Sequence, residues 1–371
     1  MKYKKANLKP DEKATLNLRG LYEQFGYKKY KMGRFEEYSL YVENKDFLAS
    51  DKVITFTDLD GRLLALKPDV TLSIIKNSMA TRQKSEKLYY IENVYRESKE
   101  SHTYKEISQM GLEYIGDVDQ YGIVEVVALA VSSLRAISPD YILEISHMSF
   151  VVELLESLDV SVEIRHKLLR LIRSKNVSAI RRTAEQTNLS AQQIASLCKI
   201  PTLYGDVAKT LKEAGKLALN KEMEAAISEL SEIYQALKAL GCAKNVQIDF
   251  SMVNDIDYYN GIIFRGYIKE LARSVLAGGQ YDSAMDMFGK DVGAMGFALY
   301  LNEISQMIQE PAKYDVDAVI LYEEGTNMVK LVQEVQRLQR EGLSVRVDRS
   351  LPENLRYQCQ YLFNGEEAVK C

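Results

Sequence analysis

The strongest constraint on the fold is the order of strand-like and helical segments along the chain. Short alternating apolar segments separated by turn signals run from about residue 52 to 149, whereas residues 151–240 are helix-rich. Strand-like sequence then returns at 246–252. This order predicts a discontinuous α+β core that carries an inserted helical domain. The predicted boundaries are 1–150 and 241–313 for the core, 151–240 for the insertion and 314–371 for a C-terminal segment.

Individual elements follow from apolar spacing and turn residues. Helical spacing over 11–25 ends before Gly26, and the Asp–Gly pair at 60–61 predicts the turn of a hairpin over 52–66. The glycines of LAGGQYD (276–282) indicate either a turn or strand edge, or a backbone that approaches a ligand closely. We further expect strands at 87–97, 108–117, 141–147 and 246–252, a helix at 120–137, a second hairpin at 257–268, and a strand running into a helix at 293–308.

The sequence after residue 313 has a different pattern. It shows a strand (DAVILY), a helix at 325–341 and another strand (LSVRVDR), which is the start of a β–α–β unit. Only 58 residues remain from Tyr314 to the last residue. We therefore expect a short, truncated α/β segment.

Composition limits the class of protein. Hydrophobic residues make up 46% and charged residues 27%, the balance of a globular protein, so disorder over the whole chain is excluded. The net charge of −4 and the sequence pI near 5.7 argue against a dedicated nucleic-acid-binding protein. We find no secretory signal, and no apolar run reaches the roughly 18–20 residues of a membrane span. A cytoplasmic chain is therefore expected.

The sequence has no common metal or nucleotide motif. Neither the cysteines nor the histidines show metal-ligand spacing, so we expect no metal site and no disulfide framework. The sequences GxxxxGK[ST], GxGxxG and GxSxG do not occur. The cysteines and histidines are Cys198, Cys242, Cys359, Cys371, His102, His147 and His166.

Polar residues lie within predicted strands, where they need an explanation. Gln109 and Glu113 are four residues apart, so they point to the same face of a strand, and Asp69 and Thr71 would share a face by the same rule. One interpretation is a solvent-exposed sheet face. The other is a concave site that holds a zwitterion with a basic ring, because Arg can bind a carboxylate and carboxylates can bind ring nitrogens. The candidate residues are Asp69, Thr71, Arg96, Gln109, Glu113, Tyr258 and Tyr259.

The stretch 165–182 contains seven Lys or Arg residues and no acidic residue. It could bind an acidic partner or RNA. It could equally be the solvated face of a helix whose other face carries Leu168, Leu169, Leu171 and Ile172.

The order of several motifs resembles histidyl-tRNA synthetase and its non-synthetase relatives over about residues 10–310. The matching pieces are LKPDVT (66–71), YRE…SQMGLEYIG (95–116), DIDYYNGIIF (255–264), LAGGQYD and GAMGFALYLNEI (293–304). The resemblance implies the class II aminoacyl-tRNA synthetase core, an antiparallel sheet flanked by helices that usually dimerises. It also implies that the helical block is the family's insertion domain.

The resemblance implies a histidine pocket at the same candidate residues. Asp69 and Thr71 match the family's L-[RK]-P-[ED]-x-T stretch, and Arg96 matches the motif 2 arginine that faces the ligand's carboxylate. Gln109 and Glu113 match a Q-x-G-x-E pair, and Tyr258 with Tyr259 matches the two tyrosines of R-G-L-D-Y-Y. In this assignment Asp69, Thr71 and Gln109 hold the amino group, and Glu113 with a tyrosine holds the imidazole.

The adenylation machinery of the resembling family is not retained. Asn254 and Glu303 stand where the family has arginines, Ile107 replaces an aromatic residue, and Gln280 replaces the arginine of G-G-R-Y-D. A unit charge at ~4 Å is worth about 4 kcal/mol at an effective dielectric near 20, so reversing the charge at position 303 costs about 8 kcal/mol. Adenylation depends on such charges.

A chain with the amino-acid pocket and without ATP chemistry resembles the regulatory subunit of ATP phosphoribosyltransferase. That resemblance implies no catalysis by this chain and no cofactor. It implies a hetero-octamer with the short catalytic subunit at the first step of histidine biosynthesis, with feedback inhibition by L-histidine. The alternatives are a diverged histidyl-tRNA synthetase and a paralogue that binds tRNA through 165–182.

Overall fold

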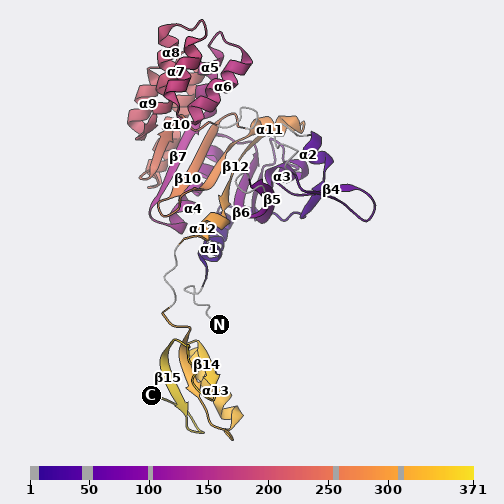
Figure 1. Ribbon diagram of the computed structural model, residues 1–371, viewed down its shortest axis with the longest axis vertical. Helices are drawn as coiled ribbons and strands as arrows, with labels where there is room; N and C mark the ends of the chain where they lie inside the picture. Colours follow the sequence, from indigo (N-terminus) through magenta and orange to yellow (C-terminus); the bar gives the residue numbers. More distant parts are fainter. Residues whose placement is uncertain (1–7, 44–52, 99–102, 254–258, 308–312) are drawn as a thin grey trace. The chain divides into compact units, whose positions relative to one another are not determined.

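A nine-stranded sheet organises Pro10–Met307, the first of two units into which the chain divides (Figure 1). The computed structural model describes residues 8–43, 53–98, 103–253, 259–307 and 313–371. Neighbouring strands pair antiparallel, except that β1 is parallel to β5 and β7 is parallel to β9. Across the sheet the order is β1 (Lys28–Lys29), β5 (Glu86–Ser98), β6 (Thr103–Gly116), β12 (Gly293–Tyr300), β11 (Ser274–Gln280), β10 (Ile262–Ile268), β7 (Tyr141–His147), β9 (Val246–Asp249) and β8 (Tyr204–Gly205).

One face of this sheet is covered by α1 (Pro10–Gln24) and α4 (Gln120–Ile137), which lie where the sequence predicts helices. Every second strand residue, such as Leu112 and Phe297, points toward these helices because side chains alternate between the faces. Tyr22 of α1 contacts the ring of Phe297. By length and composition α4 could cross a membrane, but 61% of that span is buried in the core, which accounts for its apolar sequence.

A smaller three-stranded sheet precedes the long β5–β6 hairpin. The predicted hairpin over 52–66 is confirmed, with Asp–Gly at its turn and Gly61 at a φ of +82° that favours glycine. The elements of this region are β2 (Phe35–Glu37), α2 (Ser39–Glu43), β3 (Thr55–Thr57), β4 (Leu63–Leu66) and α3 (Thr71–Asn77).

A run of helices follows β7, over the residues for which we predicted an insertion, and forms the group of helices beyond that end of the sheet in Figure 1. Five of its helices begin at a side chain that accepts a backbone N–H, namely Ser161, Asn176, Ser190, Asp206 and Asn220. Its apolar residues join the core of the sheet, so the two parts share one hydrophobic core. The helices are α5 (Met148–Glu156), α6 (Val162–Arg173), α7 (Val177–Glu185), α8 (Ala191–Lys199), η3 (Ile200–Thr202), α9 (Val207–Gly215) and α10 (Lys221–Ala239).

Two strand predictions need correction. The described part of 257–268 contains one strand, β10, which pairs with β11 and β7 rather than forming a hairpin of its own. The glycine segment 276–282 is not a turn, because most of it belongs to β11 in the interior of the sheet. A Cβ at Gly278 would lie 2.3 Å from the carbonyl oxygen of Gly296, so glycine lets these strands approach closely.

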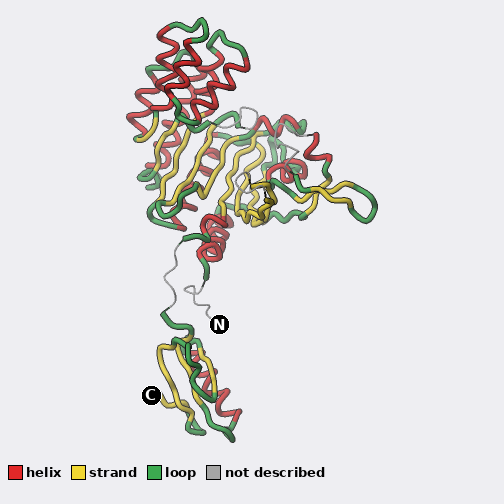
Figure 2. Tube along the Cα trace, viewed as in Figure 1, coloured by secondary structure: helices red, strands yellow, loops and turns green. Residues whose placement is uncertain are grey.

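The second unit has a four-stranded sheet and one helix among its described residues (Figure 2). The predicted β–α–β pattern is confirmed, since β13 and β14 are parallel and α13 lies between them in sequence. Leu331 and Leu338 of the helix pack on Ala318 and Ile320. The elements are β13 (Val316–Leu321), α13 (Met328–Arg340), β14 (Val345–Asp348), β15 (Tyr357–Phe363) and β16 (Ala368–Lys370).

Candidate functional site

The second face of the main sheet has a floor of small residues at its centre. Paired positions on β6, β12 and β11 run across this face in two adjacent rows. Small residues leave space above the strands, and larger side chains from neighbouring positions fill part of it. We call this surface the small-residue floor; it consists of Gly111, Gly296, Ala298, Ala277 and Gly279.

Glu113 is the most buried acidic side chain of the site, with 2% of its surface exposed. Its Oε1 accepts a hydrogen bond from Thr71 Oγ1 at 2.9 Å, and its Oε2 accepts one from the Tyr281 hydroxyl at 2.5 Å. The carboxylate lies over Gly296, where a Cβ would be 1.8 Å from Oε2. Burial raises the pKa of Glu113 to about 8, although both hydroxyl donors oppose that rise.

Two tyrosines extend over the same floor. A Cβ at Gly111 would lie 2.4 Å from the Tyr90 hydroxyl, and a Cβ at Gly279 would lie 2.7 Å from the ring of Tyr259. Burial raises the pKa of Tyr90 well above its usual range, so this phenol stays protonated and can donate. The floor is thus surrounded by hydroxyl groups and one buried carboxyl group.

Arg96 supplies a cation beside this cluster. Its Nη2 contacts Asp69 Oδ2 at 3.1 Å, and its Nε donates to the carbonyl oxygen of Pro68 at 2.6 Å. Its side chain is 39% exposed, so the guanidinium is accessible to a ligand. A carboxylate could therefore replace Asp69 as a partner of the guanidinium.

The start of α3 brings Asp69 and Thr71 to the site. We predicted that they share a strand face, and that reason is wrong: Thr71 opens the helix, and Asp69 accepts a hydrogen bond from the Leu72 N–H at 3.0 Å. An Asp just before an apolar run is a helix-start signal, which the strand interpretation overlooked. Lys290 fixes the other end of α3 by donating to the Ser78 carbonyl at 2.7 Å.

The structure gathers most of the predicted site residues on this one face. Glu113, Gln109, Thr71, Asp69 and Arg96 line it, and Tyr259 lies over the floor. Tyr258 lies outside the described residues. The sequence argument missed two tyrosines of the site. Tyr281 donates to Glu113, and the Tyr90 hydroxyl lies over Gly111 of the floor. Tyr281 follows β11 directly, two residues after Gly279, and its contact with Glu113 arises only in the folded chain.

This arrangement can bind a small zwitterion with a polar ring. It has an accessible guanidinium, an acidic acceptor at Asp69 and a buried carboxyl group with hydroxyl neighbours. At position 303, where the resemblance would require an arginine for a triphosphate, the carboxylate oxygen Oε1 of Glu303 lies 3.9 Å from Nη1 of Arg273. Asn254 lies outside the described residues. Among the described residues, no group of three acidic, Cys or His side chains could hold a metal ion.

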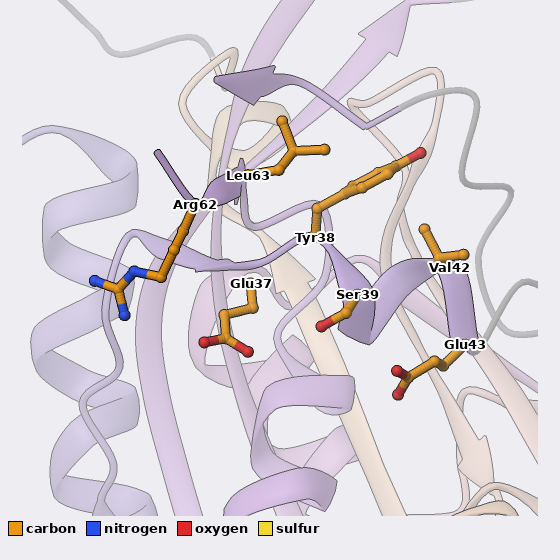
Figure 3. A pocket seen from close by; sticks show the side chains of 7 residues that line it. All are labelled: Glu37, Tyr38, Ser39, Val42, Glu43, Arg62 and Leu63. Atoms are coloured by element: carbon orange, nitrogen blue, oxygen red, sulfur yellow. The ribbon is translucent and has the colours of Figure 1, made fainter. Parts of the chain in front are cut away.

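A separate surface hollow lies beside the smaller sheet (Figure 3). It has a volume of about 530 Å³ and contains none of the predicted site residues. Its polar side chains are Glu37, Tyr38, Ser39, Glu43 and Arg62, and in Figure 3 their polar ends do not meet at one point. This hollow therefore offers no convergent set of ligand groups.

Comparisons of this chain with family models and with known proteins point to the same family. The histidyl-tRNA synthetase family model matches residues 4–304. An ATP phosphoribosyltransferase regulatory subunit of Bacillus cereus is 30% identical over 361 residues, which is 94% of this chain and 84% of the relative.

Two solved structures share the fold. One is an ATP phosphoribosyltransferase regulatory subunit/histidyl-tRNA synthetase of Bacillus halodurans, with a TM-score of 0.78 and 23% identity, covering 91% of this chain and 88% of that chain. The other is from an ATP phosphoribosyl transferase (HisG:HisZ) complex of Thermotoga maritima, with a TM-score of 0.62 and 20% identity, covering 78% and 97%. With the sequence match, these likenesses place the chain in the histidyl-tRNA synthetase-like family of ATP phosphoribosyltransferase regulatory subunits.

Proposed function

We propose that this chain is a non-catalytic subunit that activates a short catalytic subunit of ATP phosphoribosyltransferase and confers feedback inhibition by L-histidine. The relatives' names and the complex of the Thermotoga maritima protein support the partner. The step concerned is the first of histidine biosynthesis. In this proposal, histidine binds on the small-residue floor and acts on catalysis only through the assembly.

The observation that carries the proposal is the buried Glu113 beside two hydroxyl groups, with Arg96 accessible on the same face. The imidazole of histidine would replace hydroxyl donors at Glu113, and its carboxylate would bind Arg96. Asp69, Thr71 and Gln109 would hold the ammonium group. Such a ligand satisfies a buried carboxylate that burial alone would leave protonated.

Inhibition through the assembly requires two states with different histidine affinities. A ligand shifts an equilibrium only by its difference in affinity for the two states. If histidine inhibits by weakening substrate binding, linkage requires that the substrates weaken histidine binding by the same factor. Arg96 and Asp69 are candidates for this response, because histidine competes for both members of their ion pair.

The proposal includes a dimer, for which the smaller sheet offers a surface. Phe35 and Phe56 are 53% and 36% exposed and their ring centroids lie 5.1 Å apart. A second copy that covers these rings would remove apolar surface from water. Sedimentation velocity should then give a dimer for the unmodified chain and a smaller species for Phe56→Glu.

The function is tested by reconstitution with a short catalytic subunit of the enzyme. Product formation from ATP and phosphoribosyl pyrophosphate should require this chain and should fall when L-histidine is added. Glu113→Ala should still activate but should resist histidine. Histidine-driven exchange of pyrophosphate into ATP by this chain alone would contradict the non-catalytic role. Activation that stays fully sensitive to histidine in Glu113→Ala would contradict the pocket.

A further inference from the structure

Tyr300 stands at one end of the small-residue floor. It is the last residue of β12 and pairs with Gln109 of β6, which in turn pairs with Glu92 of β5. These three positions form one row on the floor's face, next to the row that contains Gly111. Gln109 is buried, and Glu92 contacts the buried Lys67 at 2.5 Å. The row is therefore a fixed wall at the end of the floor.

Tyr300 lies on the same face of the sheet as Gly296 and Ala298 of β12. Arg96 on β5 and Arg265 on β10 both lower its pKa, while burial raises it. Those two strands are separated by β6, β12 and β11, so the phenol lies within electrostatic reach of both sides of the floor. Asp69, the partner of Arg96, also acts on it. Along β5 and β6, the row of Tyr300 lies between the position of Glu113 and that of Arg96.

Side-chain size changes abruptly along β12. On the floor's face, Gly296 and Ala298 are followed by Tyr300, since side chains on one face recur at every second residue. A ligand whose ring contacts Glu113 and whose carboxylate contacts Arg96 would have its carboxyl end near this tyrosine. Any group attached beyond the carboxyl carbon would then meet the ring.

We propose that Tyr300 is a gate that restricts this site to a free amino acid and excludes ligands extended at the carboxyl group. The proposal rests on histidine binding in the proposed function and adds the class of ligand that the site rejects. The excluded class comprises acyl-linked derivatives such as aminoacyl-nucleoside compounds. Exclusion by an added bulky side chain achieves specificity through a steric clash.

Calorimetric titration can test the gate with two probes, L-histidine and a non-hydrolysable histidyl-sulfamoyl adenosine. The unmodified chain and Tyr300→Phe, which keeps the ring, should bind histidine and reject the extended compound. Tyr300→Gly and Tyr300→Ala should gain at least tenfold in affinity for the extended compound, since a misfit of one methylene already costs about 10- to 200-fold. Thermal unfolding checks that each variant is folded, and the alanine variant serves if the glycine variant is not.

The outcomes separate the gate from the proposed function. Equal binding of both probes by the unmodified chain would overturn the gate alone. Folded glycine and alanine variants that bind histidine without any gain for the extended compound would overturn it too. Failure of the unmodified chain to bind histidine, both alone and with the catalytic subunit, would overturn the proposed function and the gate together.

Discussion

Replacing Glu113 by Gln should stabilise the fold and weaken histidine binding in the same variant. The pKa of this carboxyl group rises from 4.5 to about 8 because it is buried. The folded state therefore holds its proton more tightly than the unfolded state does. The stability that protonated Glu113 contributes to the fold is fully present below pH 4.5 and is lost as the pH rises through 8. Gln has the same shape without a titratable proton, so the variant avoids that loss.

The magnitude follows from the size of the shift. At 1.36 kcal/mol per pKa unit, the raised pKa of Glu113 lowers the free energy of unfolding by about 5 kcal/mol at pH 9, about 3 at pH 7 and under about 1 at pH 5, relative to low pH. The free energy of unfolding of Glu113→Gln should exceed that of the unmodified chain by a margin that grows with pH. Histidine affinity should fall about 10- to 150-fold, because a hydrogen bond to a charged group is worth about 1.5–3 kcal/mol.

Urea unfolding at pH 5, 7 and 9 measures the first effect, and calorimetric titration at pH 7 measures the second. For the unfolding experiment Thr71→Val is a matched control, because it removes one donor to the carboxylate and leaves Glu113 titratable, so its stability should still fall as the pH rises. A stability difference that does not change with pH would refute the reasoning on burial. Unchanged histidine affinity in the Gln variant would refute the role of this carboxylate in the site.

Three further substitutions test other contacts. Arg96→Lys loses the forked guanidinium, and calorimetry should show a fall of about tenfold or more in histidine affinity; an unchanged value would exclude the carboxylate contact. Gly296→Ala places a Cβ against Glu113, so urea unfolding should show a loss of about 1–3 kcal/mol, whereas Gly20→Ala, in open space, should lose nothing. Lys175→Met leaves Asp249 without the partner that lies 2.8 Å away, and urea unfolding should show a loss of about 1–3 kcal/mol; full stability would mean that solvent replaces the pair.

Much of the fold could be predicted from periodicity alone. The apolar residues of α4 recur at helical spacing, and those of β7 alternate with period 2. The bounds of both elements match the prediction. The interior strand β11 could not be recognised, because Gly278 and Gly279 lack the side chains that carry a strand pattern. Their role depends on neighbours far away in sequence, such as Gly296 and Phe297, which come within reach only after folding.

The candidate site was predictable for residues that lie in strands and was less so elsewhere. Gln109 and Glu113 follow from period-2 spacing on one strand. Tyr281 contacts Glu113 across 168 positions of sequence, so no local pattern could show their pairing. The same holds for Tyr300 as an end wall, since its significance comes from the register of β12 against β6.

The most direct test of the central claim is a calorimetric titration of this chain with L-histidine, alone and with the short catalytic subunit present. The account predicts saturable binding of one histidine per chain, a marked loss in Glu113→Gln, and no saturable heat when ATP is titrated into the chain alone. Absence of saturable heat from histidine under both conditions would contradict the account.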